Sequence, residues 1–272
     1  MTKRFTVNKQ LSLSLALISL LFISSPIFAA ALDAKDIIQR ANQAAYYQGE
    51  DGSAQVRMII VDNQGGKQLR QFTILRKDVE NLKDQRFLVV FSRPTDVKGT
   101  VFRVNKHVAQ QDDRWLYLPA LDLVKRISAG DKRTSFVGSH FYYEDVSGRN
   151  PQEDHYQLMS VDEQSAAYII KATPKDLDSV EYAYSINHID KGSFLPKQVT
   201  YYDRQDNKIR EMNVIKTQKV NGFDTVVHSR ITQLPDGGYT DMQFRRVKYD
   251  IGLPDELFSE RSMRRPPIKW LR

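Results

Sequence analysis

The sequence contains no cysteine among its 272 residues. Disulfide bonds, CxxC redox chemistry and thiolate metal sites are therefore excluded, and so is a lipid anchor attached to a cysteine thiol. A chain of this length can bury a hydrophobic core without covalent cross-links. The absence of cysteine is thus compatible with an oxidising compartment.

Sequence motifs of common enzyme classes are also missing. There is no HExxH, GxSxG, Walker or GxGxxG motif. His140 and Glu144 lie four residues apart but have no third ligand, which favours a structural role for both. The adjacent carboxylates of Asp112 and Asp113 would point to opposite faces of a strand, and the same holds for Glu144 and Asp145. The sequence therefore predicts no catalytic residue, no metal and no cofactor, and favours a protein that is not an enzyme.

The first 31 residues have the pattern of a cleaved secretory signal peptide. A basic start is followed by the apolar stretch Leu11–Ile23, by Pro26 and by Ala29–Ala31, which offers cleavage after Ala29 or after Ala31. Serines interrupt the apolar stretch, whereas a membrane-spanning helix needs about 20 apolar residues. We expect residues 32–272 to be a periplasmic protein without a lipid anchor.

The charge balance gives little information about partners. The chain has 40 basic and 33 acidic residues, and removal of the three basic residues of the signal peptide leaves 37 against 33. This excess is too small to indicate nucleic acid, and no RNA- or DNA-binding motif is present. A mildly cationic surface favours contact with anionic lipid or an acidic partner, but solubility is the simpler interpretation.

One helix and about twelve strands are predicted. Asp33 can cap a helix that runs to Tyr47, with Gly49 as a stop signal. Alternating apolar residues then predict strands. Their ranges are 54–61, 68–76, 86–91, 100–105, 114–119, 156–161, 167–173, 180–189, 195–202, 209–220, 225–234 and 239–249.

These strands follow one another without a linker or a repeat of fixed period. A sheet of this size must curl to bury its apolar face. We therefore predict a single domain of mainly β structure with few helices, in which one curved antiparallel sheet or open barrel has the Asp33–Tyr47 helix lying across its concave side.

The segment from Arg114 to Asp145 is the most informative part of the chain. It begins with Trp115–Pro119, in which successive side chains are large and apolar. We therefore expect a strand with neither face in contact with water. Basic residues and an aromatic run broken by Gly138 follow. Glu144–Asp145 ends the run, either by hydrogen bonding to backbone or by pairing with Arg126 or Arg133. This composition indicates a flap over an apolar space.

The same segment resembles the family of outer-membrane lipoprotein-sorting proteins, relatives of the LolA/LolB periplasmic carriers. The residues that carry the resemblance are Trp115–Leu121, Arg126–Ser128 and Ser135–Asp145, with a weaker likeness through the rest of the mature chain. The resemblance implies an incomplete β-barrel covered by helices, with residues 135–145 in the lid. It also implies a partner among inner-membrane exporters of the RND type.

The flap and the strand before it supply the candidate ligand-binding residues. The sheet side of the cavity is expected to comprise Trp115, Tyr117 and Leu118, and the lid Phe136, Phe141, Tyr142 and Tyr143, with Gly138 as hinge and Arg126 at a headgroup or fixing the lid. Each aromatic side chain has an alternative interpretation as ordinary core.

The predicted function is a periplasmic carrier of a lipoprotein, a lipid or another long-chain amphiphile, with transient contact to membrane surfaces. Two alternatives remain open. One is a lipocalin-like binder of a small apolar ligand, which would show a closed eight-stranded barrel. The other is an assembly protein with a filled core and no carrier role.

Overall fold

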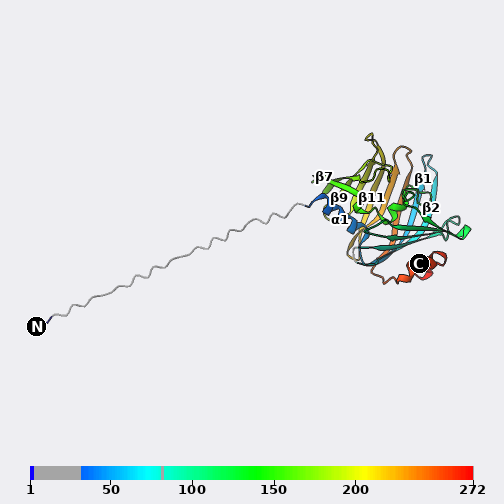
Figure 1. Ribbon diagram of the computed structural model, residues 1–272, viewed down its shortest axis with the longest axis horizontal. Helices are drawn as coiled ribbons and strands as arrows, with labels where there is room; N and C mark the ends of the chain where they lie inside the picture. Colours follow the sequence, from blue (N-terminus) through cyan, green and yellow to red (C-terminus); the bar gives the residue numbers. More distant parts are fainter. Residues whose placement is uncertain (3–31, 81–82, 272) are drawn as a thin grey trace. The chain divides into compact units, whose positions relative to one another are not determined.

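The thirteen strands of the structure, a computed structural model, form one antiparallel sheet (Figure 1). The structure describes residues 1–2, 32–80 and 83–271. The predicted signal peptide therefore lies, except for its first two residues, outside the described part of the chain. No helix in that part is long and apolar enough to cross a membrane.

The strands follow the chain in two meanders. They are β1 (Asp51–Val61), β2 (Lys67–Asp78), β3 (Gln85–Arg93), β4 (Val101–Lys106), β5 (Asp113–Leu118), β6 (Leu123–Ile127), β7 (Asp154–Asp162), β8 (Ala167–Pro174), β9 (Tyr184–Asp190), β10 (Pro196–Tyr202), β11 (Lys208–Val220), β12 (Phe223–Gln233) and β13 (Tyr239–Tyr249). The helical elements are α1 (Ala34–Tyr46), η1 (Pro119–Leu121), α2 (Tyr143–Ser147), η2 (Pro151–Glu153), η3 (Asp255–Phe258), α3 (Glu260–Arg264) and η4 (Ile268–Trp270).

The order of strands across the sheet leaves it open. β1 pairs with both β2 and β13, so it joins the first meander (β1–β6) to the second (β7–β13). The two edges are β6 and β7, which are not paired with each other. The predicted fold class, a mainly β protein with one open antiparallel sheet and few helices, is confirmed. An open sheet of thirteen strands differs from the closed eight-stranded barrel that a lipocalin-like protein would require.

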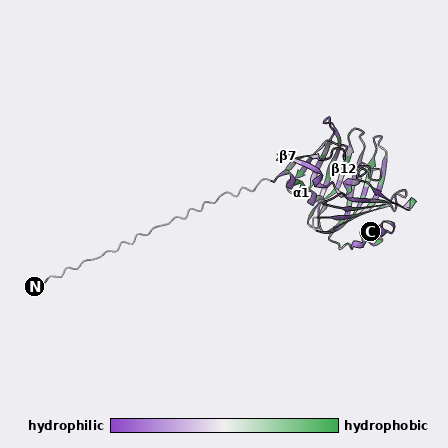
Figure 2. Ribbon diagram, in the orientation of Figure 1, coloured by the Kyte–Doolittle hydropathy of each residue, from purple (hydrophilic) through white to green (hydrophobic). Residues whose placement is uncertain are grey.

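Twelve of the strands overlap the predicted ranges, and β6 is the one that the sequence pattern missed. β6 spans five residues, includes the charged pair Lys125–Arg126 and lies at an edge. Charged residues are common on edge strands because they discourage pairing with another chain. They also remove the alternation from which the other strands were predicted. Coloured by hydropathy, the strands carry both hydrophobic and hydrophilic residues (Figure 2).

Helix α1 begins and packs as the sequence predicts. The Asp33 carboxylate accepts a hydrogen bond from the Asp36 backbone N–H at 2.7 Å, which satisfies one of the free donors of the first turn. Ile37 and Ala41 are buried against Ile170 and Ile189 of β8 and β9. The helix thus lies across the concave side of the second meander, which confirms the prediction.

The first meander is covered on both faces. Its concave face carries a cluster that includes Phe72, Phe91 and Phe102. On its convex face, Leu75 and Leu88 pack beneath the C-terminal segment (residues 250–271), which runs along the outside of the sheet in Figure 1. These strands therefore bury side chains at successive positions, as the apolar sequence of Trp115–Pro119 indicated.

Phe136 provides a direct test of the concave core. Its fully buried ring lies 5.5–6.0 Å, centroid to centroid, from the rings of Phe72, Phe91, Phe102 and Tyr143. We expect Phe136→Ala to lower the free energy of unfolding by about 3–5 kcal/mol, measured by urea denaturation. The control Met159→Ala, at a half-exposed position on β7, should change it by no more than about 0.5 kcal/mol. A loss below 1 kcal/mol for Phe136→Ala would contradict this packing.

Candidate functional site

A cavity of about 420 Å³ lies between the concave face of the sheet, helix α1 and the segment that joins the two sheet edges. Its walls come from both meanders, and they are mostly apolar. The apolar lining includes Phe72, Ile74 and Phe87 from the first meander and Val199, Met212, Ile231, Met242 and Phe244 from the second. Small-molecule sites commonly have volumes of about 300–1,000 Å³ and similar linings, so the cavity has the size and character of a binding site.

Helix α1 forms one wall because the residues on its inner side are small. Ala41, Ala44 and Ala45 line the cavity together with Ile38. An alanine side chain ends at Cβ, so these positions cover the sheet without filling the space above it. Ala45, in the last turn of the helix, is itself exposed.

The opposite wall is the flap (residues 128–148), which crosses from edge strand β6 towards edge strand β7. Its tip is a tight turn in which the Phe136 N–H donates to the Phe141 carbonyl at 2.7 Å. Val137 and Gly138 occupy the left-handed region there, with φ values of 50° and 77°. Any β-carbon at position 138 would meet open space, so glycine is favoured by its φ angle and not by crowding.

Glu144 of the flap is a carboxylate buried among three cations. Its oxygens lie 2.8 Å from Arg133 Nη1, 2.9 Å from Lys132 Nζ and 3.4 Å from Arg149 Nη1. Burial alone would raise the pKa of Glu144, but the neighbouring charges of Arg133, Arg149 and Lys132 outweigh it. They lower the pKa from 4.5 to about 2. A carboxylate in this setting stays ionised at neutral pH and holds the flap by charge-assisted hydrogen bonds.

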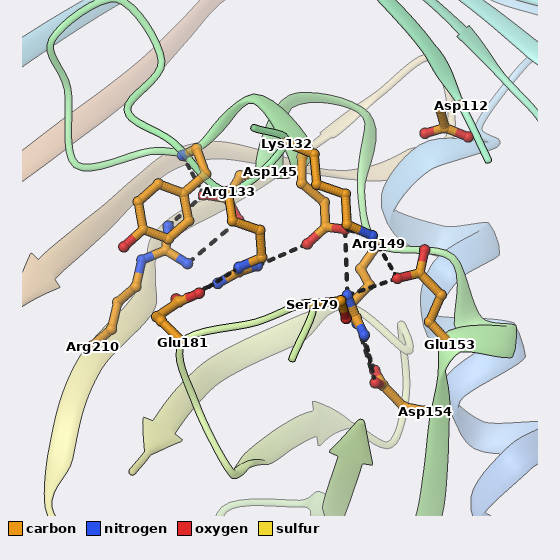
Figure 3. Close-up of polar contacts among 12 residues, drawn as sticks. Asp112, Lys132, Arg133, Asp145, Arg149, Glu153, Asp154, Ser179, Glu181 and Arg210 are labelled. Carbon is orange, nitrogen blue, oxygen red and sulfur yellow. Dashed lines mark hydrogen bonds and ion pairs between the residues drawn. The ribbon is translucent and has the colours of Figure 1, made fainter. Parts of the chain in front are cut away.

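The same cations connect the flap to the second meander and its adjoining loops (Figure 3). Arg133 Nε donates to Glu181 at 2.7 Å, and Arg149 Nη2 lies 3.0 Å from Asp154 of β7. Asp145 forms an ion pair with Arg210 of β11. The flap is therefore fixed to the first meander by aromatic packing and to the second by ion pairs.

Tyrosine rings complete the polar end of the cavity. The guanidinium of Arg210 lies 4.2 Å from the ring centroid of Tyr142, and that of Arg133 lies 4.8 Å from the same ring. Tyr182 and Tyr201 line the cavity next to these arginines. Cation–π contacts of this kind contribute about 0.5–2 kcal/mol when they are shielded from water.

The sequence of this chain matches a known protein family. The model of a family described as "Uncharacterized protein" matches residues 83–265, which is more than half of the chain. The chain belongs to this family. The comparison with curated proteins finds no match.

Solved structures agree with the family assignment. A DUF1329 family protein from Desulfovibrio piger is 29% identical, with a TM-score of 0.77 over 85% of this chain and 97% of that one. A putative outer membrane lipoprotein-sorting protein domain from Vibrio parahaemolyticus is 25% identical, with a TM-score of 0.77 over 85% of this chain and 98% of that one. A LolA superfamily protein from Nitrosomonas europaea, 17% identical, has the same fold, with a TM-score of 0.66 over 85% and 99% of the two chains.

Of the nine candidate ligand-binding residues, the LolA-like structure places Phe141 in the cavity wall. Phe136 and Tyr143 lie behind it in the concave core. Tyr142 packs its ring against the two arginines described above, and Gly138 lies at the tip of the flap. The flap residues are thus brought together, but most of them anchor the flap instead of facing the cavity.

The residues predicted from strand β5 and its hairpin lie elsewhere. Trp115 and Tyr117 point to the convex face, where they pack beneath the C-terminal segment. Leu118 points to the concave face and packs on its core without reaching the cavity. Arg126 is exposed and pairs with Asp113 of β5, and not with the flap carboxylates. These four residues therefore do not line the cavity described above. Trp115 and Tyr117 lie outside it because successive residues of a strand face opposite sides and the C-terminal segment covers the convex side.

Sequence reasoning missed the larger part of the lining. Met242 and Phe244 on β13 alternate with the polar Gln243, and the three alanines of α1 recur on one side of that helix. Both patterns are visible in the sequence, but neither distinguishes a cavity wall from ordinary core. Arg133, by contrast, was predicted as a partner of the flap carboxylates, and its contact with Glu144 confirms this.

The polar groups at the cavity are arranged for holding the flap. Glu144, Asp145 and Asp154 are each paired with arginine. Among the described residues no group of three or more His, Cys, Asp or Glu side chains could hold a metal ion. The arrangement can enclose an apolar chain and keep its lid in place.

Glu144 makes a pH-dependent contribution to stability that can be measured. Because its pKa falls from 4.5 to about 2 on folding, the contribution is complete above pH 4.5 and is lost as the pH falls towards 2. We expect Glu144→Gln to lower the free energy of unfolding at pH 7 by about 3–5 kcal/mol, since it removes the negative charge that three buried cations share. The variant should also lose less stability than the unmodified protein between pH 4.5 and 2.

Urea denaturation at several pH values makes this comparison. The control is Glu163→Gln, which removes an exposed carboxylate paired with Lys191 and should leave both the stability and its pH profile nearly unchanged. An acid transition of the same size in Glu144→Gln and the unmodified protein would refute the role of Glu144.

Proposed function

We propose that this protein is a periplasmic carrier that holds a long-chain amphiphile, either a lipid or the acyl chains of a lipoprotein, in the cavity beneath α1. The observation that supports this most is the mostly apolar cavity of about 420 Å³ between sheet, helix and flap. An assembly protein with a filled core would have no use for such a space. The paired carboxylates at its polar end favour binding over bond-making chemistry.

The energetics of lipid transfer give a physical reason for such a cavity. Each CH₂ group moved from an apolar phase into water costs about 0.8 kcal/mol, so a long acyl chain leaves a bilayer only if another apolar environment receives it. The side chains of Phe72, Ile231 and Met242 offer that environment. Release requires that the cavity can open, and helix α1 and the flap are the two elements that cover it.

The relatives support the same class of cargo. The Vibrio parahaemolyticus domain is described as a putative outer membrane lipoprotein-sorting protein, which favours acyl chains of lipoproteins among the candidate ligands. The signal-peptide pattern of residues 1–31 supports a periplasmic location, and the absence of cysteine supports a carrier without a lipid anchor. An inner-membrane exporter of the RND type is the proposed protein partner.

Blocking the cavity from the helix side tests the proposal. Ala45→Trp places a large side chain at an exposed helix position that lines the cavity, and Gln39→Trp places the same side chain on an exposed part of α1 outside the lining. We expect Ala45→Trp to weaken binding of a fluorescent fatty acid at least tenfold, because the indole occupies the ligand's space. Gln39→Trp should bind the probe as the unmodified protein does.

Thermal unfolding of both variants provides the necessary control. Each substitution is at an exposed position, so each should change the free energy of unfolding by no more than about 0.5 kcal/mol. Equal probe affinity in the two variants would show that the ligand does not enter this cavity. Absence of probe binding by the unmodified protein would refute a carrier of single acyl chains.

A further inference from the structure

The turn between β5 and β6 and the end of the C-terminal segment meet on the outside of the first meander. Arg264 donates to the Asp122 backbone carbonyl at 3.0 Å and forms an ion pair with the Asp122 carboxylate. Its guanidinium also lies 5.5 Å from the ring centroid of Tyr117. Trp270 packs in the same cluster as Val124 of β6. Two segments that are 142 residues apart in the chain are thereby fixed next to each other.

Large apolar side chains are exposed at this junction. Among the described residues, Leu121 and Ile268 are the most exposed large hydrophobic side chains after Met1, at 70% and 64% of their full accessible area. Ile268 is four residues from Arg264, so their α-carbons are at most about 14 Å apart. Single exposed apolar residues are ordinary, but a group of them indicates a contact surface.

The C-terminal end of this junction is rich in basic residues. Residues 261–271 contain four basic side chains and no acidic one. Arg261, Arg265 and Lys269 are exposed and have no ion pair with a carboxylate of the described residues. Lys269 lies over the ring of Trp270, 5.2 Å from its centroid. Exposed Leu and Ile beside Lys, Arg and Trp is the combination by which peripheral proteins bind anionic bilayers.

We propose that Leu121, Arg261, Arg265, Ile268 and Lys269, here called the docking surface, bind the surface of an anionic phospholipid bilayer. Leu121 and Ile268 enter the headgroup region, and the cations meet lipid phosphates. This inference rests on the proposed function in one respect, since a carrier of amphiphiles must meet a membrane to load or release them. The docking surface lies outside the sheet, so bilayer contact and cavity occupancy are separate properties.

Charge reversal tests the electrostatic part. Arg265→Glu/Lys269→Glu changes two exposed cations of the docking surface, and Lys208→Glu/Lys216→Glu makes the same change in net charge on exposed positions of β11. Binding to vesicles of phosphatidylglycerol and phosphatidylcholine is measured by co-sedimentation at low and moderate salt. We expect the first variant to bind at least tenfold more weakly and the β11 variant to bind within twofold of the unmodified protein.

The contribution of the exposed apolar side chains is tested by a second variant with its own control. Leu121→Ser/Ile268→Ser removes the two most exposed apolar side chains of the docking surface, while Ile215→Ser removes a 53% exposed one from β11. The first variant should lose at least fivefold in vesicle affinity, and Ile215→Ser should not. Equal losses in the docking-surface and β11 variants would overturn the proposal, because net charge or general stickiness would then explain binding.

Two further outcomes separate this inference from the carrier function. If the unmodified protein does not bind anionic vesicles, the docking surface is not a membrane site and an acidic protein becomes the candidate occupant. If Ala45→Trp loses the fatty-acid probe but retains vesicle binding, both proposals are supported. If no probe binds the cavity while the docking-surface variants still lose vesicle binding, the carrier function fails and the membrane site stands.

Discussion

The position of the flap depends on one buried carboxylate. Glu144 is surrounded by Lys132, Arg133 and Arg149, and all three cations also pair with acidic residues of the second meander or its adjoining segments. Because a buried ion pair is costly to break once formed, the network fixes the flap in one place. An open sheet with two unpaired edges needs such a connection, since no hydrogen bonds run from β6 to β7.

The cavity exists because its two sides are filled differently. On the first meander, Phe136 and Tyr143 of the flap fill the concave face with aromatic rings. On the second, the cover is α1, whose inner residues Ala41, Ala44 and Ala45 leave space above the strands. The C-terminal segment covers the convex face of the first meander, so the sheet is stable there without closing into a barrel. The aromatic rings packed on the first meander thus stabilise the sheet, and the small residues of α1 leave the cavity unfilled on the side of the second meander.

Much of the fold could be predicted from the sequence, and less of the site. The alternation of apolar and polar residues located all strands except β6, whose charged pair Lys125–Arg126 interrupts that alternation. Asp33 marked the start of α1. The apolar run at Trp115 correctly indicated a strand covered on both faces, but alternation cannot tell which face a distant segment covers. Phe141 was identified in the cavity wall, whereas the lining from α1 and β13 depends on tertiary packing between elements about 200 residues apart.

The claim that the cavity carries an amphiphile is tested most directly by native mass spectrometry of protein purified from the periplasm in mild conditions. The account predicts a population heavier than the polypeptide by the mass of one lipid or acylated peptide, released on collisional activation. The same added mass should be absent when the cavity is blocked by a large side chain. A spectrum that contains only the polypeptide mass, even after incubation with excess phospholipid or lipopeptide, would contradict the account.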